Sequence, residues 1–113
     1  MSAIDLDIDR FFGEIVSTRM EIEECTKWMN DYEKKRYDYP CWKTKDGENI
    51  PIYDITDSHL DNLIPFIEKQ DPNNETNWIE LFKTEKFYRR LKKKVEELKQ
   101  TLHEYENIEY NVF

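Results

Sequence analysis

The basic residues near the end of the chain have the types and spacing of an anion-binding site. Arg90 and Lys94 are four residues apart, and Arg89, Lys92 and Lys93 occupy neighbouring positions at helical spacing. Side chains three and four residues apart share one face of a helix, and guanidinium and ammonium groups bind phosphates through charge-assisted hydrogen bonds. This basic strip could therefore hold a phosphate, with Tyr88 or Phe87 stacking on a base. The alternative is a solvated face that pairs with acidic residues of another helix or of a second subunit.

A second candidate site lies in the centre of the chain. His59 and Asn62 are three residues apart on an expected short helix, so they share a face beside an expected β-hairpin. They could bind a ligand or partner, or they could tie the hairpin to the helix through hydrogen bonds. Together with the strip, the candidate ligand- or partner-binding residues are Trp42, Lys43, Lys45, His59, Asn62, Tyr88, Arg89, Arg90 and Lys93.

Residue types that serve catalysis or metal binding are present, but their spacing does not form a site. The two Cys and two His residues lack the spacing of metal ligands. Asp54, Asp57 and Asp61 lie close together, but a turn and a helix start attract Asp without any chemistry. We expect no catalytic residue, no metal, no cofactor and no enzyme activity.

Two segments that could position these residues keep an apolar seven-residue repeat, with spacings of three and four in strict alternation. Such a repeat places one apolar seam along a helix. The first seam is Ile4, Ile8, Phe11, Ile15, Thr18, Ile22, Cys25, Met29 and Tyr32. The second is Leu81, Thr84, Tyr88, Leu91, Val95, Leu98, Leu102 and Tyr105. We expect a mainly α fold in which long helices over 4–36 and 76–105 pair as an antiparallel helical hairpin, or coiled coil.

The segment between the long helices predicts an inserted β-hairpin over 41–53. Asp46-Gly47 between short β-prone runs is a strong hairpin signal. Pro51 cannot donate to a strand ladder, so its strand lies at an edge. An isolated hairpin is marginal in water, so we expect it to pack on the helices through Trp42, Ile50 and Ile52.

A short helix is expected over 57–69. Ser58 and Asp61 resemble a capping box at its start, and Pro65 should kink or divide it. Asn77 with Glu80 could cap the last long helix. A separate apolar tail, 106–113, would follow in this single domain of 1–113.

More apolar residues flank the two seams than a two-helix pairing can bury. Exposed apolar patches usually mark an interface, so we expect a homo-oligomer, such as a dimer that forms a four-helix bundle. The alternative is that the central segment and the tail fold back over them. The flanking residues are Phe12, Val16, Met20, Trp28, Trp78, Phe82 and Phe87.

The formal charge of −8 opposes binding to duplex nucleic acid, whose phosphates would meet a repulsive field. No apolar run approaches the ~20 residues that a membrane-spanning helix needs. The acidic N-terminal residues 1–10 do not resemble a signal peptide, and the two cysteines give little sign of a disulfide framework. We expect a cytoplasmic protein.

The central residues resemble a pattern found in small phage and prophage proteins: Trp-x-Thr-x-Asp-Gly, alternating Ile, an acidic turn, then His-Leu-x-Asn. The resemblance covers only residues 42–62, and Ile55 stands where the pattern tends to have Met. The matching residues are Trp42, Thr44, Asp46, Gly47, Ile50, Ile52, Asp54, Asp57, His59, Leu60 and Asn62.

The resemblance implies a phage origin and an anti-defence role. Our first functional expectation is a non-catalytic interaction protein that inhibits a host defence component by binding it, since an acidic surface suits a partner with basic patches. The alternative is a sponge for a cyclic-nucleotide or related immune signal, held by the basic strip. A structural or assembly role of the coiled coil is the third.

Overall fold

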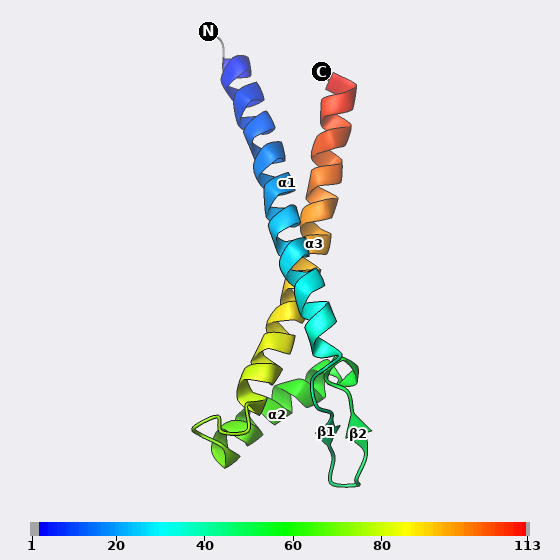
Figure 1. The fold of residues 1–113 in the computed structure, drawn as a ribbon. Coiled ribbons are helices and arrows are strands. Elements are labelled where there is room, and N and C mark those ends of the chain that lie inside the picture. Colours follow the sequence, from blue (N-terminus) through cyan, green and yellow to red (C-terminus); the bar gives the residue numbers. More distant parts are fainter. Residues whose placement is uncertain (1–2, 113) are drawn as a thin grey trace. The chain divides into compact units, whose positions relative to one another are not determined.

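The computed structural model describes the backbone of residues 3–112 and the side chains of residues 8–111. The predicted mainly helical fold is confirmed (Figure 1). The chain divides into two compact units, Asn30–Arg90 and the two terminal segments together, 1–29 and 91–113. Its elements in chain order are α1 (Ala3–Arg36), β1 (Trp42–Lys43), β2 (Asn49–Ile50), the 3-10 turn η1 (Ile52–Asp54), α2 (Asp57–Gln70) and α3 (Trp78–Val112).

In the terminal unit the first part of α1 packs against the last part of α3. The rings of Phe11 and Tyr105 lie 5.6 Å apart, and Lys94 pairs with Glu21 at 2.8 Å. Early α1 therefore meets late α3, and the two segments are antiparallel as predicted. Every seam residue of this unit from position 8 onward is buried or half-buried, because the seven-residue repeat keeps one face of each helix toward the other. The side chain of Ile4 lies outside the described residues.

The prediction of a separate tail over 106–113 is wrong for the described residues, because α3 continues to Val112. No Gly or Pro follows Tyr105 to stop the helix. The side chain of Asn111 donates to the carbonyl of Asn107 at 2.8 Å within the last turns. This segment does not fold back over the flank of α1, where Val16 and Met20 remain 54% and 57% exposed. Phe113 lies outside the described residues.

In the unit Asn30–Arg90 the predicted hairpin forms with shorter strands. Trp42 pairs with Ile50 and Lys43 with Asn49. Gly47 adopts φ 84°, and its N–H donates to the Thr44 carbonyl at 3.0 Å. A three-residue loop that ends on a left-handed Gly is a common hairpin connection. The second strand does not reach residue 53, because Pro51 has no N–H for the ladder and the chain turns instead into η1.

The hydrophobic core of this unit lies between α2, η1 and α3. Trp42 and Ile50 pack against it, and Ile52 is buried within it, so the predicted hairpin contacts are confirmed. Phe82, predicted to lie on an exposed flank, is 0% exposed because α2 covers it. The buried residues of the core are Ile52, Ile55, Leu60, Leu63, Ile64, Ile67 and Phe82.

Helix α2 begins at Asp57 as predicted, but its N-cap lies two residues before Ser58, where the capping box was predicted. Its N-cap is Thr56, whose Oγ1 accepts a hydrogen bond from the His59 N–H at 3.2 Å. Ser58 lies inside the first turn and cannot take that role. Pro65 does not divide the helix, which runs unbroken to Gln70. The cap is one of the bonds that hold His59 at the start of α2.

Thr56→Ala should lower the free energy of unfolding by ~1 kcal/mol, because it leaves a helix N–H without its acceptor. Ser58→Ala should change it by no more than ~0.5 kcal/mol, as is usual for an exposed position. Urea unfolding followed by circular dichroism measures both. Equal losses would contradict Thr56 as the cap, and a larger loss in Ser58→Ala would place the cap at Ser58 instead.

The loop before α3 is organised by Asp71 rather than by the predicted pair of Asn77 and Glu80. Asp71 Oδ1 accepts from the Glu75 N–H and Oδ2 from the Thr76 N–H, both at 2.8 Å. Hydrogen bonds from the side chain and the backbone of Thr76 lower the pKa of the Asp71 carboxyl. Asn77 has φ 67°, a left-handed conformation that Asn tolerates well.

The lowered pKa of Asp71 predicts a pH-dependent contribution to stability. The carboxylate stabilises the folded chain above its ordinary pKa of about 4, and that stabilisation is lost as pH falls through the lower folded value. Wild type should therefore exceed Asp71→Asn in urea midpoint at neutral pH, and the gap should close as the pH is lowered below about 4. A gap that stays constant with pH would show that the charge of Asp71 is not involved.

Candidate functional site

A pocket of about 550 Å³ opens between β1 and α2 in the unit Asn30–Arg90. Its volume lies within the ~300–1,000 Å³ range of typical ligand sites. The hairpin contributes four consecutive residues and α2 contributes one helical face. The lining residues are Trp42, Lys43, Thr44, Lys45, His59, Asn62, Leu63 and Phe66. Five of the nine candidate binding residues from the sequence thus come together here: Trp42, Lys43, Lys45, His59 and Asn62.

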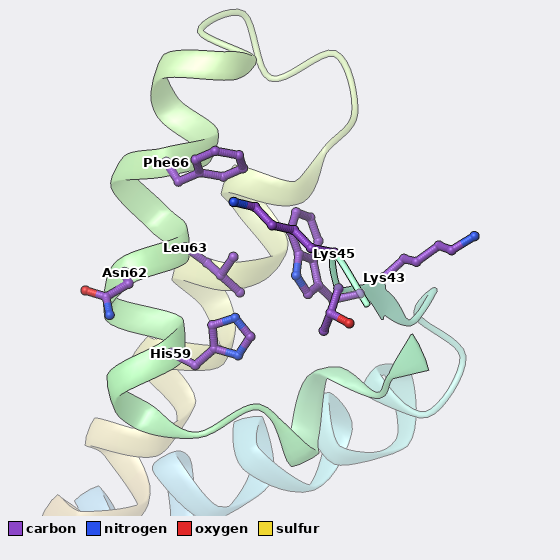
Figure 2. Close-up of a pocket in the computed structure, with 8 residues that line it drawn as sticks. Lys43, Lys45, His59, Asn62, Leu63 and Phe66 are labelled. Carbon is purple, nitrogen blue, oxygen red and sulfur yellow. The ribbon is translucent and has the colours of Figure 1, made fainter. Parts of the chain in front are cut away.

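Figure 2 shows how the labelled side chains lie around this pocket. His59, Leu63 and Phe66 project from α2 toward the hairpin. Lys45 reaches from the hairpin across the opening toward Phe66, whereas Lys43 extends away from α2. Asn62 turns to the side of α2 away from the hairpin, so it contributes at the margin of the pocket.

The lining combines an apolar surface with positive charge. Trp42 packs its ring edge-on against Trp78 at 5.4 Å, and Leu63 is buried, so this part of the wall is held by the core. Phe66 remains 48% exposed. Lys43 and Lys45 are exposed, no acidic residue lines the pocket, and neither lysine forms an ion pair within the described part of the chain. Such a site suits a partner that carries an apolar group next to a negative charge, whereas the net charge of the chain led us to expect a partner with basic patches.

A buried polar network in the same unit holds α1, η1, α2 and α3 together. Glu85 is 0% exposed. Its carboxylate accepts from the Tyr32 hydroxyl at 2.8 Å and from Arg89 Nε at 2.7 Å, and the Arg36 guanidinium lies 3.5 Å away. A buried charge is tolerated only when it is paired and hydrogen-bonded, as Glu85 is here. Burial, with the hydrogen bond to Glu85 next, raises the pKa of Tyr32 and keeps its hydroxyl a donor.

Tyr88 and Arg89, two candidate binding residues, belong to this network. The Tyr88 hydroxyl donates to Glu33, and burial together with this bond raises the pKa of Tyr88 to about 12. Arg89 also donates to Asp57 Oδ1 at 2.8 Å and to the Ile52 carbonyl at 3.3 Å. Burial alone would lower the pKa of Arg89, but its hydrogen bonds to Asp57 and Glu85 outweigh that effect and raise it. Both side chains therefore support the fold of this unit.

The remaining members of the basic strip do not converge on one site. Arg90 is exposed and borders a shallow hollow of about 330 Å³ with Lys83 and Lys86. Lys86 pairs there with Asp61 at 2.8 Å and Lys83 with Glu68 at 3.7 Å. These acidic residues offset the positive charge of the hollow. In the terminal unit Lys93 is exposed and Lys94 pairs with Glu21. The pair of Lys94 and Glu21 agrees with the alternative interpretation of the strip, in which it pairs with acidic residues of another helix.

Other residues with reactive side chains have ordinary surroundings in the described part of the chain. Cys25 is half-buried in the seam of α1 and Cys41 is exposed, and both are free thiols. The residues described contain no group of three His, Cys, Asp or Glu side chains placed to hold a metal ion. None of the described helices has an apolar stretch long enough to cross a membrane.

No protein-family model, curated protein or solved structure matches this chain. Function must therefore be argued from the geometry of the pocket and its surroundings.

Three pocket residues, Thr44, Leu63 and Phe66, and the buried Glu85 were not among the candidates predicted from the sequence. Leu63 and Phe66 lie four and seven residues after His59, so helical spacing alone places them on the same face. Glu85 had a weaker signal. It lies three residues from both Phe82 and Tyr88, on the helix face that carries both rings. A charged side chain on such a buried face is stable only when groups from other elements pair with it.

Proposed function

We propose that this chain is a non-catalytic interaction protein that binds a partner protein through the pocket between β1 and α2. The observation that carries the proposal is the lining of this pocket, in which Trp42, Leu63 and Phe66 adjoin Lys43 and Lys45, two lysines that form no ion pair with any described residue. Protein interfaces typically combine a buried aromatic or aliphatic anchor with a charged rim that directs the choice of partner. Six of the eight lining residues also lie in the segment 42–62 that resembles phage proteins, and Leu63 and Phe66 follow just after it.

The resemblance over residues 42–62 supports a host defence component as the partner. Occupying a surface of such a protein would be enough to inhibit it, without any chemistry by this chain. On this proposal the protein acts in the cytoplasm of the infected cell.

The test is phage plating on host strains that each carry one defence system and express this chain. Wild type should restore plaque formation on a strain whose defence it inhibits, and the double variant Lys43→Glu/Lys45→Glu should not. Lys27→Glu, which changes an exposed lysine of α1 outside the pocket lining and the basic strip, is the matched control and should behave as wild type. A double variant that still restores plating would place the activity elsewhere on the molecule, and failure of wild type on every strain would contradict the anti-defence role.

A nucleotide sponge is the second candidate, and the pocket supports it better than the basic strip does. Three aromatic rings and two lysines in a volume of about 550 Å³ also suit a base with its phosphates. A cyclic nucleotide or an ADP-ribose derivative that binds only the folded state should raise the melting temperature by several degrees. The shift should disappear in Lys45→Glu. Arg89 is unsuitable for this test, since its replacement would disrupt the network around Glu85.

We further propose self-association through the exposed flank of α1, where Phe12, Val16 and Met20 follow one another at four-residue spacing. A second copy would cover this stripe in the manner of a helix bundle. Sedimentation of wild type and of Val16→Glu at tens of micromolar tests it: wild type should be the larger species. A monomer in both cases would contradict the proposal, and with it an assembly role of the coiled coil.

A further inference from the structure

No strand among the described residues pairs with the outer edge of β1, and the pocket borders residues of this strand. The sheet has only the two strands β1 and β2 in the described part of the chain. The Thr44 N–H donates toward β2, to the Glu48 carbonyl at 2.9 Å. Backbone groups alternate in direction along an antiparallel strand, so the N–H and C=O of Lys43 point away from β2. None of the described residues forms a hydrogen bond with either group, so both are available to another strand.

The residues that line the pocket show which side of the hairpin the pocket borders. It includes the consecutive residues 42–45 and no residue of β2, with α2 forming the opposite wall. Consecutive residues along one wall mean that the strand borders the pocket along its length, whereas alternate residues would indicate only one face of it. The space is therefore a groove between an open strand edge and a helix.

Charge selects which kind of strand this edge can accept. Lysines on an edge strand hinder pairing with most chains, including other copies of the same protein, because the ammonium groups would be left without counter-charges. An acidic segment instead supplies those charges to Lys43 and Lys45. Side chains alternate along a strand, so every second residue of such a segment would face the apolar wall formed by Leu63 and Phe66.

We propose that the partner contributes an extended acidic segment that adds to the outer edge of β1 as a third strand and places an apolar side chain against Leu63 and Phe66. This inference rests on the proposed function, which assigns the pocket as the binding site. It names the recognition mode, in which backbone hydrogen bonds to Lys43 provide the register and the groove selects the side chains.

Fluorescence anisotropy of a labelled octapeptide of alternating Glu and Leu, titrated with the full chain, tests this inference. The peptide should bind, and Lys43→Glu and Lys45→Glu should each weaken binding about tenfold, which corresponds to ~1.4 kcal/mol. Lys27→Glu should bind as wild type does, and circular dichroism should confirm that all variants are folded. An otherwise identical peptide with Lys in place of Glu should not bind.

N-methylation of the peptide backbone, one residue at a time, separates strand addition from simple charge attraction. Only alternate amides of an added strand face β1, so the loss of binding should recur at every second position near the centre of the peptide. Uniform tolerance of N-methylation, or binding of the Lys peptide, would overturn the inference. If no acidic peptide binds while Lys43→Glu/Lys45→Glu abolishes phage plating, the inference falls and the proposed function stands.

Discussion

Glu85→Ala should lose about 3–5 kcal/mol of unfolding free energy, a large part of the ~5–15 kcal/mol that typically stabilises a protein. The variant removes the partner of two cations in one step, because Arg36 and Arg89 both face this carboxylate and are only 15% and 20% exposed. It also leaves the Tyr32 hydroxyl without its acceptor. Arg89 would keep its bond to Asp57, but that aspartate is 84% exposed and water weakens its attraction.

Urea unfolding followed by circular dichroism measures this loss. Glu85→Gln retains an oxygen that accepts from Tyr32 but removes the charge. Its free energy of unfolding should therefore lie between that of Glu85→Ala and that of wild type. Glu97→Gln, at an exposed position of α3, is the matched control and should change the free energy of unfolding by less than about 0.5 kcal/mol. A loss below about 1 kcal/mol in Glu85→Ala would contradict the network, because no uncompensated buried charge would then have been created.

Phe82→Ala should lower the free energy of unfolding by about 3–5 kcal/mol, which is the usual result of removing a fully buried aromatic ring. The Phe82 ring is 0% exposed and lies 5.1 Å from the ring of Trp78 and 5.5 Å from that of Trp42. Its loss leaves a cavity under the wall of the pocket. Binding at the pocket should weaken as well, because Trp42 would lose a neighbour that holds it in place.

Phe87 provides the matched comparison on the same helix. It is 50% exposed, so Phe87→Ala should cost roughly 1 kcal/mol or less. Phe82→Leu, which fills most of the volume, should fall between Phe82→Ala and wild type. Similar losses for Phe82→Ala and Phe87→Ala would contradict the burial of Phe82 beneath α2.

Local patterns predicted the elements well where a single periodicity or turn signal governed them. The seams of α1 and α3 followed from the spacing of apolar residues, since which face of a helix is buried depends mainly on its 3.6-residue turn. The hairpin loop followed from Gly47, because its left-handed φ favours a residue without a side chain. The ends of elements were less accurate: Pro51 ended β2 early, and α3 ran past Tyr105.

The candidate site was predicted only in part. His59, Trp42 and the two hairpin lysines were singled out by residue type, and the fold brought them to one pocket. Arg89 and Tyr88 were singled out by the same reasoning, yet they lie within a structural network. An isolated sequence shows that an arginine is charged, but not whether a carboxylate from another element already binds it.

By itself, the sequence determined that the chain would form two long helices with a hairpin and a short helix between them, because helical and turn signals act over a few neighbouring residues. Only the tertiary structure decided that Phe82 is buried while Phe87 is exposed, that Glu85 is a buried charge, and that β1 and α2 enclose a pocket. These features depend on contacts between residues far apart in the chain, where burial and charge pairing are properties of the folded surroundings and not of any single residue.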